Sequence, residues 1–408
     1  MKINKERLLA DLYALREFTD TPGSGVTRFS YGEQDAKARK YISDKAAAMS
    51  CSISTDMIGN IRIGLASNRP GRKTVMAGSH IDTVRSGGWL DGIYGVCGAL
   101  EVMAVLSEAG REFSCNYEAV IFAEEEGSGF GSTMTGSKFI TGIYTDSDRD
   151  KLKNDNGETL RDVLLRWNGG SSAVSWDFDS IKTMLELHIE QGPVLDRAGL
   201  SLGIVDTIFG MRVIEVTLSG VGNHAGATPM NERYDALCTA AECILAAEQI
   251  VKDDPEKRTV VTAGKMEVSP NCSNVIPETV KFTLEVRDKD KKKIDSFMDR
   301  IIDRIKLIAG SRNVGCHIHE HSESAPLPLA ARLIDSMSER AAEQKLSYKV
   351  MDSGAVHDAC MIAAHADTGM IFVPSIDGRS HVPEENTREE HLAAGVQFLL
   401  DTVISELE

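Results

Sequence analysis

Residues 74–92 read TVMAGSHIDTVRSGGWLDG, and the order of residue types in this stretch decides the fold class. The short apolar run at 74–78 is typical of a buried strand. A glycine-containing loop follows, and the Ala-, Val- and Leu-rich pattern over residues 94–109, which ends at Gly110, predicts a helix. A strand, a loop and a helix in this order indicate an α/β protein.

The same alternation continues on both sides of this stretch. Helical patterns at 5–18 and 35–49 and strand patterns at 119–122 and 184–187 belong to it, and the pattern resumes late in the chain with a helix at 330–344, a strand at 370–373 and a helix at 389–407. We therefore expect one large, discontinuous α/β domain that is made of residues 1–210 and 325–408.

Residues 211–324 follow a different order of elements. The pattern there predicts strand 213–219, helix 232–251, strand 260–267, strand 280–287, helix 291–309 and strand 314–319. A β-α-β-β-α-β order is that of the ferredoxin-like sandwich. Because 408 residues are more than one core usually serves, we expect this segment to be a second, smaller domain inserted into the larger one.

Bulk composition excludes several classes of function. A formal net charge of −16 would repel phosphate backbones, which argues against a nucleic-acid partner. No segment approaches the roughly 20 apolar residues of a membrane span, and residues 1–18 mix charges into a helical pattern where a secretion signal needs an apolar block. The eight cysteines are scattered and form no CxxC pair, so we interpret them as reduced packing residues. We predict a cytoplasmic protein without nucleic-acid or membrane partners.

Metal-competent side chains follow four of the predicted strands, directly or after a short loop. In open α/β sheets the carboxyl ends of the strands are where sites are built, so we expect these side chains to converge although they are three hundred residues apart in sequence. Strand by strand they are His80 and Asp82; Glu124, Glu125 and Glu126; His188 and Glu190; and His381.

Asp91 completes the candidate site, because the glycines around it let the backbone bend and a helix begins beside it. An acidic residue there could lie between two cations. Imidazole and carboxylate ligands without thiolate suit zinc, manganese, cobalt or nickel and do not choose among them. Two such ions would polarise a carbonyl and lower the pKa of a bridging water, and a neighbouring carboxylate could act as the general base.

Each of these residues also has a structural interpretation. A lone histidine at a strand end is more often a hydrogen-bonded structural residue, and Asp82 could merely orient the ring of His80. The run Glu124, Glu125 and Glu126 could be a solvated loop, yet three like charges directly after a buried strand are costly without a cation nearby. The repeated placement at strand ends is what favours the metal site.

Seven stretches carry a resemblance to a known family. They cover most of the chain in family order and resemble the M20 metallopeptidase superfamily, and within it the branch of allantoate amidohydrolases and N-carbamoyl-L-amino acid hydrolases. They read GSHIDTVRSGGWLDG (78–92), AEEEGSGFGS (123–132), ELHIEQGPVLD (186–196), GNHAGATPM (222–230), PNCSNVIP (270–277), SGAVHDA (353–359) and PSIDGRSHVPEE (374–385).

The resemblance implies a zinc-peptidase-like α/β catalytic domain that holds two divalent metal ions. By motif, one ion would be bound by His80, Asp91 and His188, and the other by Asp91, Glu126 and His381. Asp91 would bridge the two ions. Glu125 would be the general base. Asp82 is not among these matches, and from its position two residues after His80 we expect it to orient that ring.

The resemblance also assigns residues of the inserted domain, which would be a lid and would form a homodimer. His224, Asn274 and Arg287 match residues that bind a substrate carboxylate or stabilise the oxyanion, with His224 reaching across the dimer. A guanidinium offers a bidentate fork for a carboxylate, and the other two can donate where charge develops. Arg287 could instead be in a surface ion pair. Gln191 is a further candidate for contact with a small carboxylate-bearing substrate.

The implied reaction is hydrolysis of the C–N bond of an N-carbamoyl-L-amino acid or a ureido acid such as allantoate, with release of ammonia and carbon dioxide. Two alternatives stay open: a dipeptidase or aminoacylase that uses the same metals, and a non-catalytic ligand-binding homologue. Three residues depart from the pattern of the relatives, with Gly129 in place of arginine, Val356 in place of glycine and Met211 in place of glutamine. They put the substrate in doubt, not the reaction class.

Overall fold

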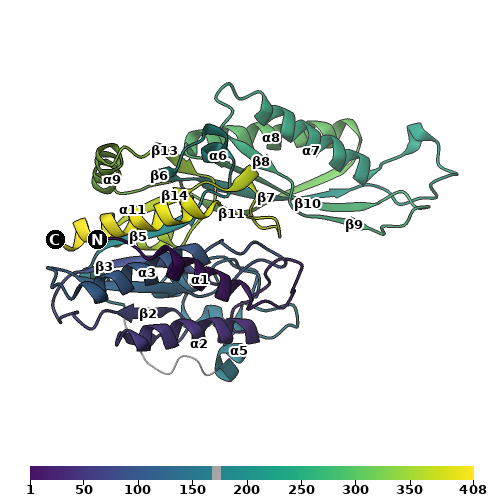
Figure 1. Cartoon of the computed structure of the whole chain (residues 1–408). Coiled ribbons are helices and arrows are strands. Elements are labelled where there is room, and N and C mark those ends of the chain that lie inside the picture. The colour runs from purple at the N-terminus through teal and green to yellow at the C-terminus, as the bar shows by residue number, and fades with distance from the viewer. Residues whose placement is uncertain (168–175) are drawn as a thin grey trace. The chain divides into compact units, whose positions relative to one another are not determined.

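A computed structural model describes residues 1–167 and 176–408, which form two compact units (Figure 1). The large unit comprises Met1–Asp206 and Leu329–Glu408, and the small unit is Thr207–Pro328. The small unit thus begins before residue 211 and ends after residue 324, because short strand β12 pairs with the end of β6 and draws both segments together. The predicted roles of the two units, catalytic and lid, stay predictions.

The larger sheet is mixed and has the order β1-β2-β4-β3-β5-β14-β6-β12, with β13 paired to β6, and all of it except β12 and the end of β6 belongs to the large unit. Its centre, β4-β3-β5-β14, is parallel, whereas the flanking pairs with assigned direction are antiparallel. The strands are β1 (Ser52–Thr55), β2 (Ile61–Gly64), β3 (Thr74–His80), β4 (Asn116–Phe122), β5 (Ile181–Ile189), β6 (Leu202–Ile208), β12 (Leu327–Pro328), β13 (Tyr348–Ser353) and β14 (Asp367–Val373).

Helices cover both faces of this sheet. Figure 1 shows α1, α3 and α11 side by side, and they contact one another. A separate apolar cluster, which includes Met76, Phe122 and Ile362, packs against the other face. The helices are α1 (Lys5–Arg16), α2 (Glu33–Ala48), α3 (Ile93–Ala109), α4 (Thr135–Ile140), α5 (Leu160–Trp167), α6 (Val194–Ala198), α9 (Ala331–Glu343), α10 (Ala359–Ile362) and α11 (Glu389–Leu407), with 3₁₀ turns at Asp146–Asp150, Phe178–Ser180 and Ile376–Gly378.

Helix α3 connects the quoted stretch to the core. Its residues from Ile93 to Leu106 are all buried, as expected for a helix that is apolar on every side. It ends at Gly110, which is left-handed (φ 59°) and forms the predicted C-cap. Gly95 allows α3 to lie close to β5, because a Cβ there would be only 2.3 Å from the carbonyl oxygen of Leu187.

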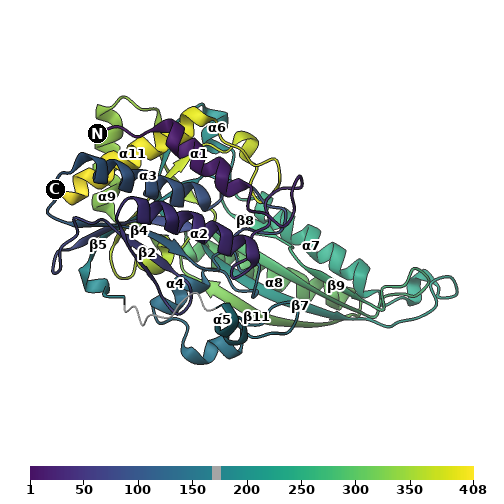
Figure 2. The same ribbon diagram turned by 60° about the horizontal axis from the view of Figure 1, so that its bottom comes forward.

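The small unit has the predicted β-α-β-β-α-β order, with the antiparallel sheet β11-β7-β10-β8 and a short strand β9 paired to β10. Helices α7 and α8 pack on one face of it and against each other (Figure 2). The predicted strand 260–267 is two short strands, since the chain leaves the ladder around Gly264. The elements are β7 (Gly210–Ser219), a 3₁₀ turn at Met230–Glu232, α7 (Ala236–Lys252), β8 (Val260–Thr262), β9 (Met266–Ser269), β10 (Thr279–Asp288), α8 (Lys291–Ser311) and β11 (Gly315–Ser324).

All eight cysteines are free thiols, and their interpretation as packing residues is wrong for Cys238, Cys272 and Cys316, which are exposed. Over residues 1–167 and 176–408, no helix combines the length and apolar character needed to cross a membrane.

Candidate metal centre

Six predicted site residues meet at the carboxyl ends of the parallel strands in the large unit. His80 is the last residue of β3, and His188 lies near the end of β5. Glu125 and Glu126 follow β4, and His381 follows β14 after a loop. The sixth is Asp91, which comes just before helix α3 and lies among the other five. The strand-end argument therefore predicted the location of this cluster.

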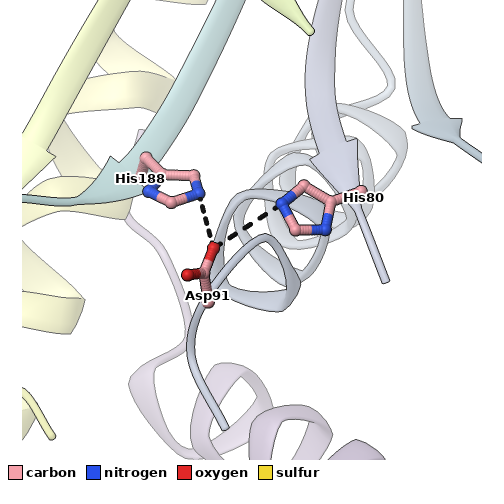
Figure 3. Close-up of side chains that lie close together, drawn as sticks. All are labelled: His80, Asp91 and His188. Carbon is pink, nitrogen blue, oxygen red and sulfur yellow. Dashed lines mark ion pairs between the residues drawn. The ribbon is translucent and has the colours of Figure 1, made fainter. Parts of the chain in front are cut away.

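The first group of donors is His80, Asp91 and His188, and all three are buried. Figure 3 shows both imidazoles turned toward the same carboxylate oxygen of Asp91. Oδ1 of Asp91 lies 3.1 Å from Nε2 of His188 and 3.6 Å from Nε2 of His80. The other ring nitrogens are within 3.0 Å of backbone carbonyl oxygens, those of Asp82 and Ile189, which leaves both Nε2 atoms to face the site.

The second group uses the other oxygen of the same aspartate. Oδ2 of Asp91 lies 3.1 Å from Nε2 of His381, which in turn is 3.4 Å from Oε1 of Glu126. The side chain of His381 is 48% exposed, so this group lies nearer to solvent than the first. Within residues 1–167 and 176–408, Oε1 of Glu126 is buried and accepts no hydrogen bond, although Nε2 of His381 lies within ion-pair distance. A buried carboxylate oxygen without a donor is what a bound cation would satisfy.

The two groups share Asp91, one oxygen each, and this arrangement fits two divalent cations side by side. Histidine nitrogens and carboxylate oxygens are ligands of zinc, manganese, cobalt and nickel. Acidic residues gather in and just behind the groups, and the mutual repulsion of five of them also calls for positive charge. They are Asp82, Asp91, Glu124, Glu125 and Glu126.

Burial raises the pKa of three consecutive glutamates at the site, and Glu125 is the one of them that lies beside His80. Burial raises its pKa well above the ordinary value, and the carboxylates of Asp358, Glu126 and Asp82 act in the same direction, while His80 opposes them. Burial together with the Asp91 carboxylate raises the pKa of Glu126 to about 7. Oε2 of Glu125 lies 3.7 Å from Nε2 of His80, beside the first group. A carboxyl with a raised pKa in this place is suited to proton transfer near neutral pH.

Asp82 supports the site in two ways. Its backbone carbonyl, 3.0 Å from Nδ1 of His80, orients the imidazole, whereas its carboxylate is 3.8 Å away. That carboxylate instead accepts hydrogen bonds from the backbone N–H groups of Glu125 (3.1 Å) and Glu126 (3.0 Å). Asp82 thus fixes the backbone of Glu125 and Glu126 as well as the ring of His80.

Gln191 and Gly129 each donate a hydrogen bond to a carboxylate of the site. Nε2 of Gln191 donates to Oδ2 of Asp91 at 2.7 Å, and its buried Oε1 accepts no hydrogen bond from the part of the chain that the structure describes. Gly129 donates its N–H to Oε1 of Glu124, and a Cβ at this position would lie 2.9 Å from that oxygen. Arginine could not replace glycine here unless the side chain of Glu124 moved.

A layer of buried polar residues behind the site was missed from the sequence. Glu186 and His357 form a third group of possible metal ligands with His188, and the ring of His357 packs 4.6 Å from that of His188. Asp358 accepts from Ser137, and Glu385 accepts from the backbone of the Asp91 loop. Glu186, His357, Asp358 and Glu385 lie in the stretches 186–196, 353–359 and 374–385 that carry the family resemblance. Their partners become clear only from the tertiary contacts.

In the small unit, His224 and Asn274 lie on paired segments. His224 forms a β-bridge with Val275, and Ala225 donates to the backbone oxygen of Asn274. Nδ1 of His224 accepts from the N–H groups of Gly226 and Ala227, which places the proton of a neutral ring on Nε2 and makes that atom a donor. Both side chains are exposed.

Arg287 lies at the other end of the same sheet. On β10, Thr279 pairs with Ser219, next to the His224 segment, whereas Arg287 pairs with Met211 at the start of β7. These eight residues of strand correspond to ~27 Å, so Arg287 cannot meet the same small ligand as Asn274 of its own chain. Within a single subunit, Arg287 and Asn274 therefore do not fit the one small substrate to which the resemblance assigns both. Arg287 forms an ion pair with Glu285 on the same strand.

Comparison with known protein families and structures gives a consistent result. The family model described as "Peptidase family M20/M25/M40" matches residues 76–405. Among solved structures, a hydantoinase/carbamoylase family amidase from Burkholderia multivorans superimposes with a TM-score of 0.90 at 32% identity, covering 100% of this chain and 98% of that one.

Curated relatives match over nearly their whole length. An N-carbamoyl-L-amino-acid amidohydrolase from Paenarthrobacter aurescens is 34% identical over 402 residues, which is 98% of this chain and 97% of the relative. An allantoate amidohydrolase from Escherichia coli (strain K12) is 35% identical over 389 residues, 94% of each chain. The similarity thus includes the loops that carry the candidate site as well as the fold.

Proposed function

Because the chain belongs to peptidase family M20/M25/M40, we propose that it is an amidohydrolase that uses two divalent metal ions and acts on N-carbamoyl-L-amino acids or ureido acids such as allantoate. It is a hydrolase of C–N bonds, as are its nearly full-length relatives. The observation that carries the two-metal proposal is Asp91, whose two oxygens each face a separate group of metal-competent side chains.

The metal ions would be held by His80, Asp91 and His188 and by Asp91, Glu126 and His381. When bound, such ions polarise a carbonyl group and lower the pKa of water. Zinc, manganese, cobalt and nickel all suit this donor set. The supporting observations are the distances within each group and the buried oxygen of Glu126, which accepts no hydrogen bond from the described residues.

Glu125 would take the proton from the attacking water on its carboxylate and return it to the leaving nitrogen. Its burial and its position beside His80 support this role. The raised pKa of Glu125 favours its uptake of that proton. The products would be ammonia, carbon dioxide and the amino acid when the substrate is an N-carbamoyl amino acid.

A homodimer would resolve the separation between Arg287 and the pair His224 and Asn274. A site that uses Arg287 of one subunit for the substrate carboxylate would take the other two donors from the partner. The exposed Nε2 donor of His224 suits an oxyanion. A cytoplasmic location stays a prediction from the N-terminal sequence.

The test measures the hydrolysis of several substrates by protein from which a chelator has removed the metal, with and without added manganese or zinc. Ammonia release would be measured from N-carbamoyl-L-methionine and allantoate, and amino-acid release from a dipeptide. Glu125→Gln protein prepared in the same way controls for contaminating enzymes. We expect metal-dependent ammonia release from at least one ureido acid. Dipeptide cleavage together with no reaction of either ureido acid would assign the protein to the peptidases instead.

A further inference from the structure

Glu385, to which no role was assigned from the sequence, lies buried behind the second group of donors. It is 1% exposed, and each of its carboxylate oxygens binds a different loop. Oε1 accepts from the backbone N–H groups of Leu90 (2.9 Å) and Asp91 (3.0 Å). Oε2 accepts from the hydroxyl of Ser380 (2.8 Å) and the backbone N–H of His381 (3.3 Å). One side chain therefore ties together two loops that are almost three hundred residues apart.

These two loops carry the two residues whose spacing defines the second group. Oδ2 of Asp91 and Nε2 of His381 lie 3.1 Å apart. His381 has little other support, because its side chain is 48% exposed and its backbone is left-handed (φ 60°), a conformation that non-glycine residues rarely adopt. The hydrogen bonds to Glu385 hold this backbone from the buried side.

The local sequence is adapted to the contact. Gly88 lies against the carboxyl group of Glu385, and a Cβ at that position would be 1.9 Å from Cδ and 2.0 Å from Oε1. Only glycine allows the Asp91 loop to come this close. Ser380 adds a further link, since its Oγ lies 3.2 Å from Oδ2 of Asp91 as well as within hydrogen-bond distance of Glu385.

We infer that Glu385 is a positioning residue that fixes Asp91 and His381 at the separation needed for the second metal ion. The first group depends on it less, because only Asp91 is shared, whereas His80 and His188 are held by their own strands and by the carbonyl oxygens of Asp82 and Ile189. The inference rests on the proposed two-metal site. A purely structural role would affect both groups alike through overall stability, so selectivity for one metal site distinguishes the two interpretations.

The decisive variant is Glu385→Gln, with Glu384→Gln as the matched control. A glutamine side chain has the same shape but only one acceptor oxygen, and its NH₂ group would face N–H or O–H donors of one loop. Glu384 is the adjacent glutamate, its side chain is 61% exposed, and it contacts Arg379 at the surface. Cobalt(II) titration of the metal-free protein, followed by calorimetry and visible absorption, measures the two sites separately.

We expect wild type and Glu384→Gln to bind two cobalt ions. Glu385→Gln should bind the first ion with only a small loss of affinity and the second about 10- to 100-fold more weakly, the usual effect of losing a partner behind a ligand. Its activity should recover at high metal concentration. If Glu385→Gln bound both ions with wild-type affinity, or lost affinity for both equally, the inference would be wrong. Fewer than two ions on wild type would instead contradict the proposed function.

Should Glu385→Gln fail to fold, Ser380→Ala provides the test, since it removes one donor to Oε2 and leaves the buried carboxylate with its other three. A smaller loss of affinity confined to the second ion is expected. Unchanged binding of both ions would count against the inference.

Discussion

At the residue scale, the site depends on side chains that lie at or just beyond the carboxyl ends of buried strands. His80, Glu125 and His188 each occupy such a position, and the rigid sheet fixes their backbones. Their convergence could be predicted from sequence, because parallel strands end at one edge of the sheet. The role of Glu385 could not, because it depends on which loops meet at that edge.

Glu125→Gln should bind both metal ions normally yet lose most of its turnover. The amide cannot accept the proton of the attacking water, and loss of a general base typically costs 10²–10⁴-fold in rate. Initial rates on the preferred substrate, together with metal content by mass spectrometry, check this. Near-wild-type turnover with full metal content would remove Glu125 from the role of base.

At the element scale, long elements with a clear period were predicted best. The predicted final helix coincides with α11, and the β-α-β-β-α-β order of the small unit is observed. The short strands β1, β2 and β6 and helix α6 were missed. They are four to seven residues long, and their pairing depends on neighbours that local sequence does not reveal. The break between β8 and β9 was missed for the same reason.

Helix α11 is tied to the sheet by a buried glutamate near its C-terminus. Glu406 accepts from Thr183 of β5 at 2.8 Å and forms an ion pair with Arg332 of α9 at 2.7 Å. Burial alone would raise the pKa of this carboxyl, but the hydrogen bonds from Arg332 and Thr183 bring it below the ordinary 4.5. One side chain thus joins three elements of the large unit.

This pKa shift predicts a pH-dependent effect of Glu406→Gln. A carboxyl whose pKa is lower in the folded chain stabilises fully above its unfolded pKa, and the contribution is lost as pH falls through the folded value. The variant should therefore unfold about 1–3 kcal/mol more easily at pH 7, and the difference should shrink below pH 4.5. Denaturant unfolding at several pH values measures this difference in the free energy of unfolding. Glu390→Gln, at an exposed position of the same helix, is the control. A deficit that does not depend on pH would contradict the assignment.

At the scale of the whole molecule, the placement of the substrate-binding candidates points to more than one subunit. Arg287 is separated from His224 and Asn274 by the length of β10, although all three are matched to the same substrate. The sequence motifs identify these residues but give no information about distance. The register of the ladder supplies that distance and supports a site shared between two subunits.

Mixing two inactive variants tests this sharing. His224→Ala and Arg287→Ala homodimers should each be impaired, but a mixed dimer contains one site with both residues intact. Co-expression in equal amounts should restore about a quarter of the wild-type rate, because half of the dimers are mixed and each has one complete site of two. Sedimentation confirms the dimer. No recovery in verified mixed dimers would mean that one subunit supplies both residues.

The central claim is that Asp91 lies between two metal ions, and anomalous diffraction from crystals of protein loaded with manganese or zinc tests it most directly. The account predicts two peaks per subunit about 3.5–4 Å apart, one beside His80 and His188 and the other beside Glu126 and His381, with Asp91 between them. A single peak, or a peak among Glu186, His188 and His357 instead, would contradict it.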